Sequence, residues 1–307
     1  MDKILYILLL AVMFNMPRGL KAQETAKIAT LKTEKQFEYN GNGSITINAE
    51  RGNINIQSWE RNEISVVLKL IAKNTDLAKA KEELSYMNYN LLKSGSGTNI
   101  ILNNKMERIP GRVNEISSII KAEYEIRVPK KINLLINNQF GQVTINNISG
   151  TIRGDLRYCD LTLQSFNGNI SMDINIGDFN GFQSSIIGGI STTHSNITLS
   201  DVSGKFNLIA KFGNFKLTYG EKPLNLNLYC NATDISIDNR KCRPVDIRLN
   251  GSYCPLKISE SCYTPNKSCL TSSYQSLEQE VWLLQYTLPD KSNKLTIHAK
   301  FGTLNLL

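Results

Sequence analysis

Apolar positions recur along this chain at a fixed spacing. Residues 140–145 read FGQVTI, with an aromatic residue at position one, glycine at position two and apolar residues at positions four and six. The pattern returns every 18 residues, as YCDLTL, IGDFNG, HSNITL and FGNFKL, starting at residues 158, 176, 194 and 212. A second series begins midway between these units, as SGTIRG, NGNISM, SIIGGI and SGKFNL, starting at residues 149, 167, 185 and 203. The units at 176 and 185 fit imperfectly.

The two series differ in kind, because position one is mostly bulky in the first and Ser or Asn in the second. A string of antiparallel hairpins gives no strong reason for second neighbours to match. Stacked coils do, since like residues then lie above one another along the axis. The pattern therefore predicts an all-β solenoid with about 18 residues per coil, each coil having two short strands and two turns. Apolar positions four and six form the inner face of each strand.

Units of the same kind lie outside this central region. They start at residues 42 and 51 near the beginning, at 221, 232, 244 and 253 further on, and at 292 and 301 near the end. The irregular spacing predicts insertions of two or three residues in the turns before 232 and 244. The last unit, FGTLNL at 301–306, is expected to end the stack, where an exposed edge could pair with another copy of the chain.

Two segments depart from the repeat. Residues 74–88 carry apolar side chains at helical spacing behind an Asn-Thr-Asp start, which predicts one short flanking helix. Longer strands are expected between 89 and 138, interrupted by a polar loop at 104–118. Residues 259–281 are rich in Ser and Tyr and form an irregular, cysteine-containing insertion.

The first 22 residues place Lys3 before an apolar run, Ile4 to Phe14, and a small residue at Ala22. This is typical of a secretory signal peptide and too short for a membrane span. We therefore expect export to the periplasm, the cell surface or the medium, with residues 23–307 forming a single domain without a transmembrane segment. The formal charge of +8 is spread along the chain, which does not favour nucleic-acid binding.

The chain has six cysteines, an even number that suits an oxidising compartment. Cys262 and Cys269 are the most favourable pair for a disulfide, because a bond between them would close the irregular insertion. Cys159 and Cys254 take the glycine position of the repeat, which predicts small buried thiols. The spacing matches no zinc motif, so neither a metal nor a cofactor is expected.

Candidate catalytic residues are sparse. His194 takes the ring position of its unit, which favours a stacked ring, and His298 lies on an expected strand without a carboxylate motif nearby. Asp155, Asp160, Asp173, Asp178 and Asp201 recur near turns, where solvation explains them better than calcium binding. Trp59 lies in an expected turn and is the aromatic residue best placed for surface contact with a ligand.

The residues from 43 to 66, the helical segment after them, YEIRVPKKINLLINNQFGQVTI at 124–145 and the later repeats resemble a bacterial putative-adhesin family of exported β-strand-repeat domains of unknown function. The resemblance covers most of residues 35–220 and fades towards the cysteine-rich end. It implies a right-handed parallel β-helix with a link to adhesion, and it transfers no catalytic residue.

These features predict an exported, non-enzymatic, adhesin-like binding or scaffold protein of the bacterial cell envelope, whose partner is an unknown protein or glycan. Two alternatives stay open at this point. A carbohydrate-active lyase or hydrolase on a β-helix would need paired acidic residues in a cleft, and a purely structural envelope component would bind no ligand. The sequence does not indicate the oligomeric state.

Overall fold

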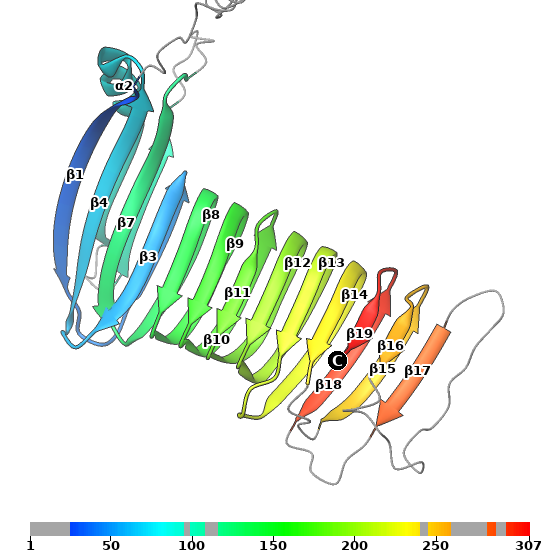
Figure 1. Ribbon diagram of the computed structural model, residues 1–307. Coiled ribbons are helices and arrows are strands. Elements are labelled where there is room, and N and C mark those ends of the chain that lie inside the picture. The colour runs from blue at the N-terminus through cyan, green and yellow to red at the C-terminus, as the bar shows by residue number, and fades with distance from the viewer. Residues whose placement is uncertain (1–24, 95–98, 108–115, 240–244, 259–280, 287–292) are drawn as a thin grey trace, which may run out of the picture.

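The computed structural model describes residues 25–94, 99–107, 116–239, 245–258, 281–286 and 293–307. Within these residues α2 (Leu77–Leu84) is a short helix, and all the remaining elements are strands (Figure 1). The strands are β1 (Lys27–Glu38), β2 (Ser44–Glu50), β3 (Gly52–Trp59), β4 (Glu63–Asn74), β5 (Met87–Ser94), β6 (Asn99–Met106), β7 (Ile119–Pro129), β8 (Lys131–Asn146), β9 (Ser149–Gln164), β10 (Asn167–Asn175), β11 (Phe179–Phe182), β12 (Ser185–Ser200), β13 (Ser203–Thr218), β14 (Leu224–Asp238), β15 (Asp246–Ser252), β16 (Leu256–Ile258), β17 (Val281–Tyr286), β18 (Lys294–Lys300) and β19 (Leu304–Leu306). The expectation of an all-β, solenoid-like chain with one short helix is confirmed.

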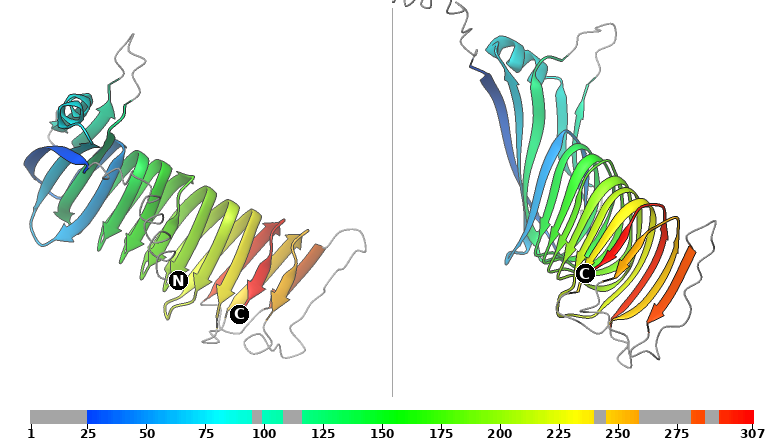
Figure 2. Two further views of the ribbon diagram at one scale, coloured as in Figure 1. Left: turned by 45° about the horizontal axis from the view of Figure 1, so that its top comes forward. Right: turned by 45° about the vertical axis from the view of Figure 1, so that its right-hand side comes forward.

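The strands form two runs of paired neighbours, which we call sheet 1 and sheet 2. Sheet 1 contains β2, β10, β18, β15 and the first halves of the long strands β8, β9, β12, β13 and β14. Sheet 2 contains β3, β11, β19, β16 and the second halves of the same long strands. Neighbours in this central stack run parallel, and the coils follow one another along one axis (Figure 2).

Residues 18 apart in the sequence are paired from β8 to β13. Ile152 lies beside Ile170, and Leu199 beside Leu217. Burial alternates along each strand, so every second side chain points inward and joins one continuous apolar core. Burying a large aliphatic side chain contributes about 1.5–3 kcal/mol. A single coil has too few of these side chains to stand alone, and its neighbours supply the other walls of the core.

Each central coil bends at single residues with a left-handed backbone. The first corner lies between the two sheets of a coil and is occupied along the stack by Arg51, Phe140, Tyr158, Ile176, His194, Phe212, Ala232, Phe301 and Tyr253, with φ between 51° and 63°. The second corner is occupied by Asn147, Ser165, Gln183 and Asp201. The two short strands predicted for each coil therefore run together into one long strand that turns sharply at a single residue.

The last strands do not end the stack. β18 lies between β14 and β15, and β19 lies between β14 and β16, so the chain returns to fill a gap inside its own column (Figure 1). The expectation of FGTLNL as an exposed terminal edge is wrong. Beyond this inserted coil, β17 pairs antiparallel with β15.

Position two of the repeat supports this order independently. From the second coil onward it is occupied by Gly141, Cys159, Gly177, Ser195, Gly213, Thr233, Gly302 and Cys254. Glycine alternates with a small residue only when Gly302 stands between Thr233 and Cys254, as it does in space and not in the sequence. A Cβ atom at Gly177, Gly213 or Gly302 would overlap the backbone carbonyl oxygen of the small residue in the preceding coil.

The first predicted insertion lies earlier than expected. Gly204 already pairs with Leu224, which places the two extra residues in the connection between Thr218 and Leu224. The register proposed for EKPLNL at 221 is therefore wrong by two residues. Phe206 and Leu208 lie beside Leu226 and Leu228, so the unit begins at Pro223. The region of the second expected insertion, before 244, lies outside the described residues.

Antiparallel strands close the column at its N-terminal end. β4 pairs antiparallel with β1 and with β7, and β7 pairs parallel with β3. The predicted helix is present and shorter than its pattern, because it begins at the Asp76 cap, whose carboxylate accepts a hydrogen bond from Ala78 N. Residues 104–106 of the expected loop belong to β6, and most of the remainder lies outside the described residues.

Cys159 and Cys254 are buried, as their position in the repeat predicted, and Cys230 is buried as well. The Cys159 thiol contacts the carbonyl oxygens of Asn138 and Arg157. Cys242, Cys262 and Cys269 lie outside the described residues, so the Cys262–Cys269 disulfide stays a prediction.

Cys159 and Cys230 should resist thiol reagents in the folded protein. Burial raises the pKa of each thiol to about 12, and the thiolate is the reactive species. At pH 8 we expect labelling by iodoacetamide to be slower by orders of magnitude than in guanidinium chloride, measured peptide by peptide by mass spectrometry. Equal labelling rates in the two conditions would contradict the buried positions.

Candidate binding surface

The first corner carries a row of mostly apolar, exposed or partly exposed side chains, which we call the corner ridge: Phe140, Tyr158, Ile176, His194, Phe212, Ala232, Phe301 and Tyr253. Phe140 stacks on Tyr158 with ring centroids 5.0 Å apart, and His194 stacks on Phe212 at 4.8 Å. Tyr253 stacks on Phe301 at 5.5 Å. The predicted role of His194 as a stacked ring is confirmed. These distances match the spacing of neighbouring β-strands, about 4.8 Å.

The backbone does not require rings at this corner. A left-handed conformation costs an ordinary L-residue about 1–2 kcal/mol, and Asn and Asp tolerate it best. The second corner has the same left-handed backbone and carries Asn147, Ser165, Gln183 and Asp201. Stacking offsets part of the cost, since an aromatic pair contributes about 0.5–1.5 kcal/mol beyond its buried area. Even so, Phe140 and Tyr158 leave 42% and 50% of their surface in solvent.

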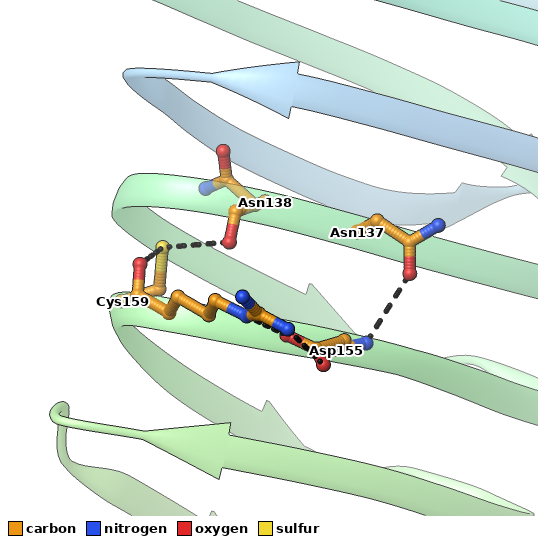
Figure 3. A network of polar contacts seen from close by, with 5 residues as sticks. Asn137, Asn138, Asp155 and Cys159 are labelled. Carbon is orange, nitrogen blue, oxygen red and sulfur yellow. Dashed lines mark hydrogen bonds and ion pairs between the residues drawn. The ribbon is translucent and has the colours of Figure 1, made fainter.

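A shallow groove of about 690 Å³ lies beside the ridge on the outer face of sheet 1. Its floor carries Asn103, Asn48 and Asn137, one residue from each of three neighbouring strands. Asn137 Nδ2 donates to Asn48 Oδ1, and Asn48 Nδ2 donates to Asn103 Oδ1, both at 2.9 Å. Asn137 Oδ1 accepts a hydrogen bond from the Asp155 amide (Figure 3). The amide side chains of this row point outward, and the row still offers hydrogen-bond donors and acceptors at its edges.

Two buried groups support this groove from inside. Asn138 bonds both backbone groups of Gly52, accepting from its N–H and donating to its carbonyl oxygen at 2.7 Å. The Cys159 thiol contacts the Asn138 carbonyl oxygen from the next coil (Figure 3). On the outer face the Arg157 guanidinium donates to the Asp155 carboxylate, which raises the pKa of Arg157. These contacts hold the corner in register below Phe140.

A second groove, of about 330 Å³, lies on the same face near the C-terminal coils. Tyr229 and His298 stack above its floor with ring centroids 4.9 Å apart and planes 5° from parallel. Lys211 and Lys300 also line it, and each occupies the next outward-facing position along its strand, towards the corner. Sequence reasoning missed this groove, because Tyr229 and His298 come together only when β18 enters between β14 and β15.

The other predicted residues have local partners. Trp59 is partly buried at the end of β3, where its indole N–H donates to the Glu63 carbonyl oxygen at 2.8 Å and Arg61 lies over its ring. Its contact with a ligand stays a prediction. Asp160 and Asp178 accept hydrogen bonds from backbone amides one coil away. Within the described residues, no three His, Cys, Asp or Glu side chains are grouped so as to hold a metal ion.

The model of the Toastrack DUF4097 family matches residues 42–257, well over half of the chain. The chain belongs to the Toastrack DUF4097 family. The resemblance to an adhesin-type family that the sequence indicated is thereby confirmed. The match includes the coils from β2 to β15, and with them every residue of the corner ridge except Phe301.

Solved structures similar to this Toastrack chain are distant. A putative adhesin from Bacteroides fragilis aligns with 90% of this chain and 97% of its own, at 9% identity and a TM-score of 0.37. A putative cell adhesion protein from Clostridium sporogenes aligns over 91% and 99%, at 12% identity and a TM-score of 0.26. A putative lipid binding protein from Parabacteroides distasonis aligns over 91% and 97%, at 7% identity and a TM-score of 0.28. With TM-scores this low, we transfer no property of these proteins to this chain.

No curated protein is similar enough to this Toastrack chain to be matched. The described part of the chain contains no helix with the length and hydrophobicity of a membrane span.

Proposed function

We propose that this Toastrack chain is an exported, non-enzymatic, adhesin-like protein that binds an external protein or glycan through the outer face of sheet 1 and the corner ridge. In this proposal residues 1–22 direct export and are removed, and residues 23–307 form one domain. The column is a right-handed β-helix with about 18 residues per coil. The pairing of residues 18 apart supports the coil length, and connections between parallel strands are right-handed in about 98% of cases.

One observation carries the proposal. Two corners share the same left-handed backbone, yet only the first exposes stacked pairs of rings, while the second carries polar residues. Because polar residues are compatible with this backbone at the second corner, folding does not require rings at the first. We therefore attribute the rings to binding at the surface. Apolar side chains aligned along one edge, beside a face of outward amides, suit a ligand that lies along the column.

Replacing Phe140 and Tyr158 together by Asn tests this proposal. Asn is favourable in the left-handed conformation, so the loss of stacking is partly offset and the melting temperature should change by only a few degrees. Binding to arrays of glycans and extracellular-matrix proteins, measured with the intact protein, should fall by about tenfold for whichever ligand the unaltered protein binds.

Ser165→Asn is the matched control, since it makes the same final residue in the same conformation at the second corner and should leave binding unchanged. Absence of binding by the unaltered protein across both arrays would favour a purely structural component. Hydrolysis or cleavage of an arrayed polysaccharide would favour the enzyme alternative.

A further inference from the structure

The outer face of sheet 1 changes character towards the C-terminal end. Its last coils carry five outward cationic side chains, of which Lys294 is partly buried and the others are exposed: Lys205 and Lys211 on β13, Lys294 and Lys300 on β18, and Arg248 on β15. None of the five forms an ion pair within the described part of the chain. The outward positions on β13, β14 and β18 in sheet 1 include no carboxylate, and Asp246 on β15 is buried.

The second groove lies in the middle of this basic area. Tyr229 and His298 form its aromatic wall, and Lys211 and Lys300 stand one outward position nearer the corner. Asn231 and Asn250 add amide groups that can donate and accept hydrogen bonds. Between these outward residues lie Ala210, Cys230, Ala299 and Gly251 on successive strands, at positions that face the core, so the floor of the groove is strand backbone.

We propose that this surface, the basic groove formed by Lys211, Tyr229, Asn231, Asn250, His298 and Lys300, binds an acidic polysaccharide. The ammonium groups attract carboxylate or sulfate groups, the stacked rings accept the apolar face of a sugar, and the amides bond its hydroxyl groups. Lys205, Lys294 and Arg248 extend the positive charge along the same strands, away from the corner, so the site suits a chain of charged sugars more than one free anion. This inference rests on the proposed function and names its ligand class.

The composition of the groove favours a polysaccharide over other polyanions. A membrane surface would call for several exposed apolar side chains that enter the bilayer. This groove has one exposed aliphatic side chain, Ile209, beside the ring pair, and its other outward side chains are lysines, amides and a serine. A single-stranded nucleic acid would call for a succession of rings on which bases stack, while this groove offers the pair of Tyr229 and His298.

The test measures binding of the intact protein to immobilised polygalacturonic acid and to heparin by biolayer interferometry, with dextran as the neutral polymer. The variant Lys211→Gln/Lys300→Gln should lose affinity by about tenfold, and Tyr229→Thr, which keeps a β-forming residue on the strand, by about fivefold. Raising the salt from low to physiological concentration should weaken binding further, because exposed charges are screened. The matched control is Lys216→Gln/Lys257→Gln, which removes the same charge from the outer face of sheet 2.

Loss for the sheet 1 pair with retention for the sheet 2 pair supports the inference. Equal loss for both pairs overturns it, since net charge alone would then explain binding. Equal or tighter binding to phosphatidylglycerol vesicles or to an oligo(dT) strand, with the same sensitivity to the variants, also overturns it. Binding of another ligand through Phe140 and Tyr158 without any binding of acidic polysaccharides overturns this inference and leaves the proposed function standing. Binding of no ligand overturns both.

Discussion

Replacing Leu304 by Asp should unfold the C-terminal coils and leave the central ones folded. Leu304 is fully buried and lies between Ile235 of β14 and Leu256 of β16. The substitution removes about 1.5–3 kcal/mol of apolar burial and places a carboxylate in the core, so the free energy of unfolding of this region should fall by at least about 4 kcal/mol. Hydrogen exchange should show lost protection in β14 and β16 and retained protection in β9 and β10, because solenoid coils depend mainly on their neighbours.

The adjacent residue provides the control. Asn305 lies between the same two strands, beside Ser236 of β14 and Lys257 of β16, and points outward. Asn305→Asp should change protection little, since its charge stays in water. If Leu304→Asp exposed the amides of β19 alone and left β14 protected, β19 would be a frayed end and not an inserted coil.

The repeat could be predicted because it follows from local chemistry. Positions four and six must be apolar to face the core, and the corner needs a residue compatible with positive φ, so both leave a signal in each unit. The stacking of Phe140 on Tyr158 and of His194 on Phe212 follows directly from that 18-residue register. The polar corner was harder to locate, since Asn147 and Ser165 also suit an ordinary turn.

The order of the coils could not be predicted by reading units in sequence order. FGTLNL matches the repeat equally well as a last coil or as an inserted one, and only its neighbours distinguish the two. One signal was available, however. From Gly141 onward, glycine and a small residue alternate at position two without a break only if the final unit, with Gly302, moves inside the stack between Thr233 and Cys254.

The candidate surface also has one part that could be predicted from local sequence and one part that depends on a long-range contact. The ridge beside the first groove comes from successive coils and was visible as a row at position one. The basic groove combines β13, β14 and β15 with β18, which belongs to the returning segment. Its rings and lysines therefore become neighbours only through a long-range contact. Trp59, the aromatic residue that the sequence favoured for surface contact, is partly buried, with Arg61 over its ring and its indole N–H donating to the Glu63 carbonyl oxygen.

The alternation at position two also leads to a prediction at Gly213, which has φ of +135°. Gly213→Ala should lower the free energy of unfolding by about 3 kcal/mol or more, because a methyl group there would overlap the Ser195 carbonyl oxygen in the preceding coil. That carbonyl belongs to the backbone of a packed strand and has little freedom to move. The change can be measured by urea denaturation followed by circular dichroism.

Gly189 is the matched glycine, since it lies on neighbouring β12 but faces outward on sheet 1. A Cβ atom there would meet no heavy atom closer than 4.0 Å, and its φ lies outside the left-handed region. Gly189→Ala should therefore stabilise the protein by about 0.4–1 kcal/mol, because it restricts the unfolded chain without straining the folded one. If Gly213→Ala lowers the free energy of unfolding and Gly189→Ala raises it, the destabilisation at Gly213 arises from the contact between coils. Similar destabilisation at both positions would instead mean that β12 and β13 tolerate no added volume in general. The close approach of backbones at position two would then not explain the effect at Gly213.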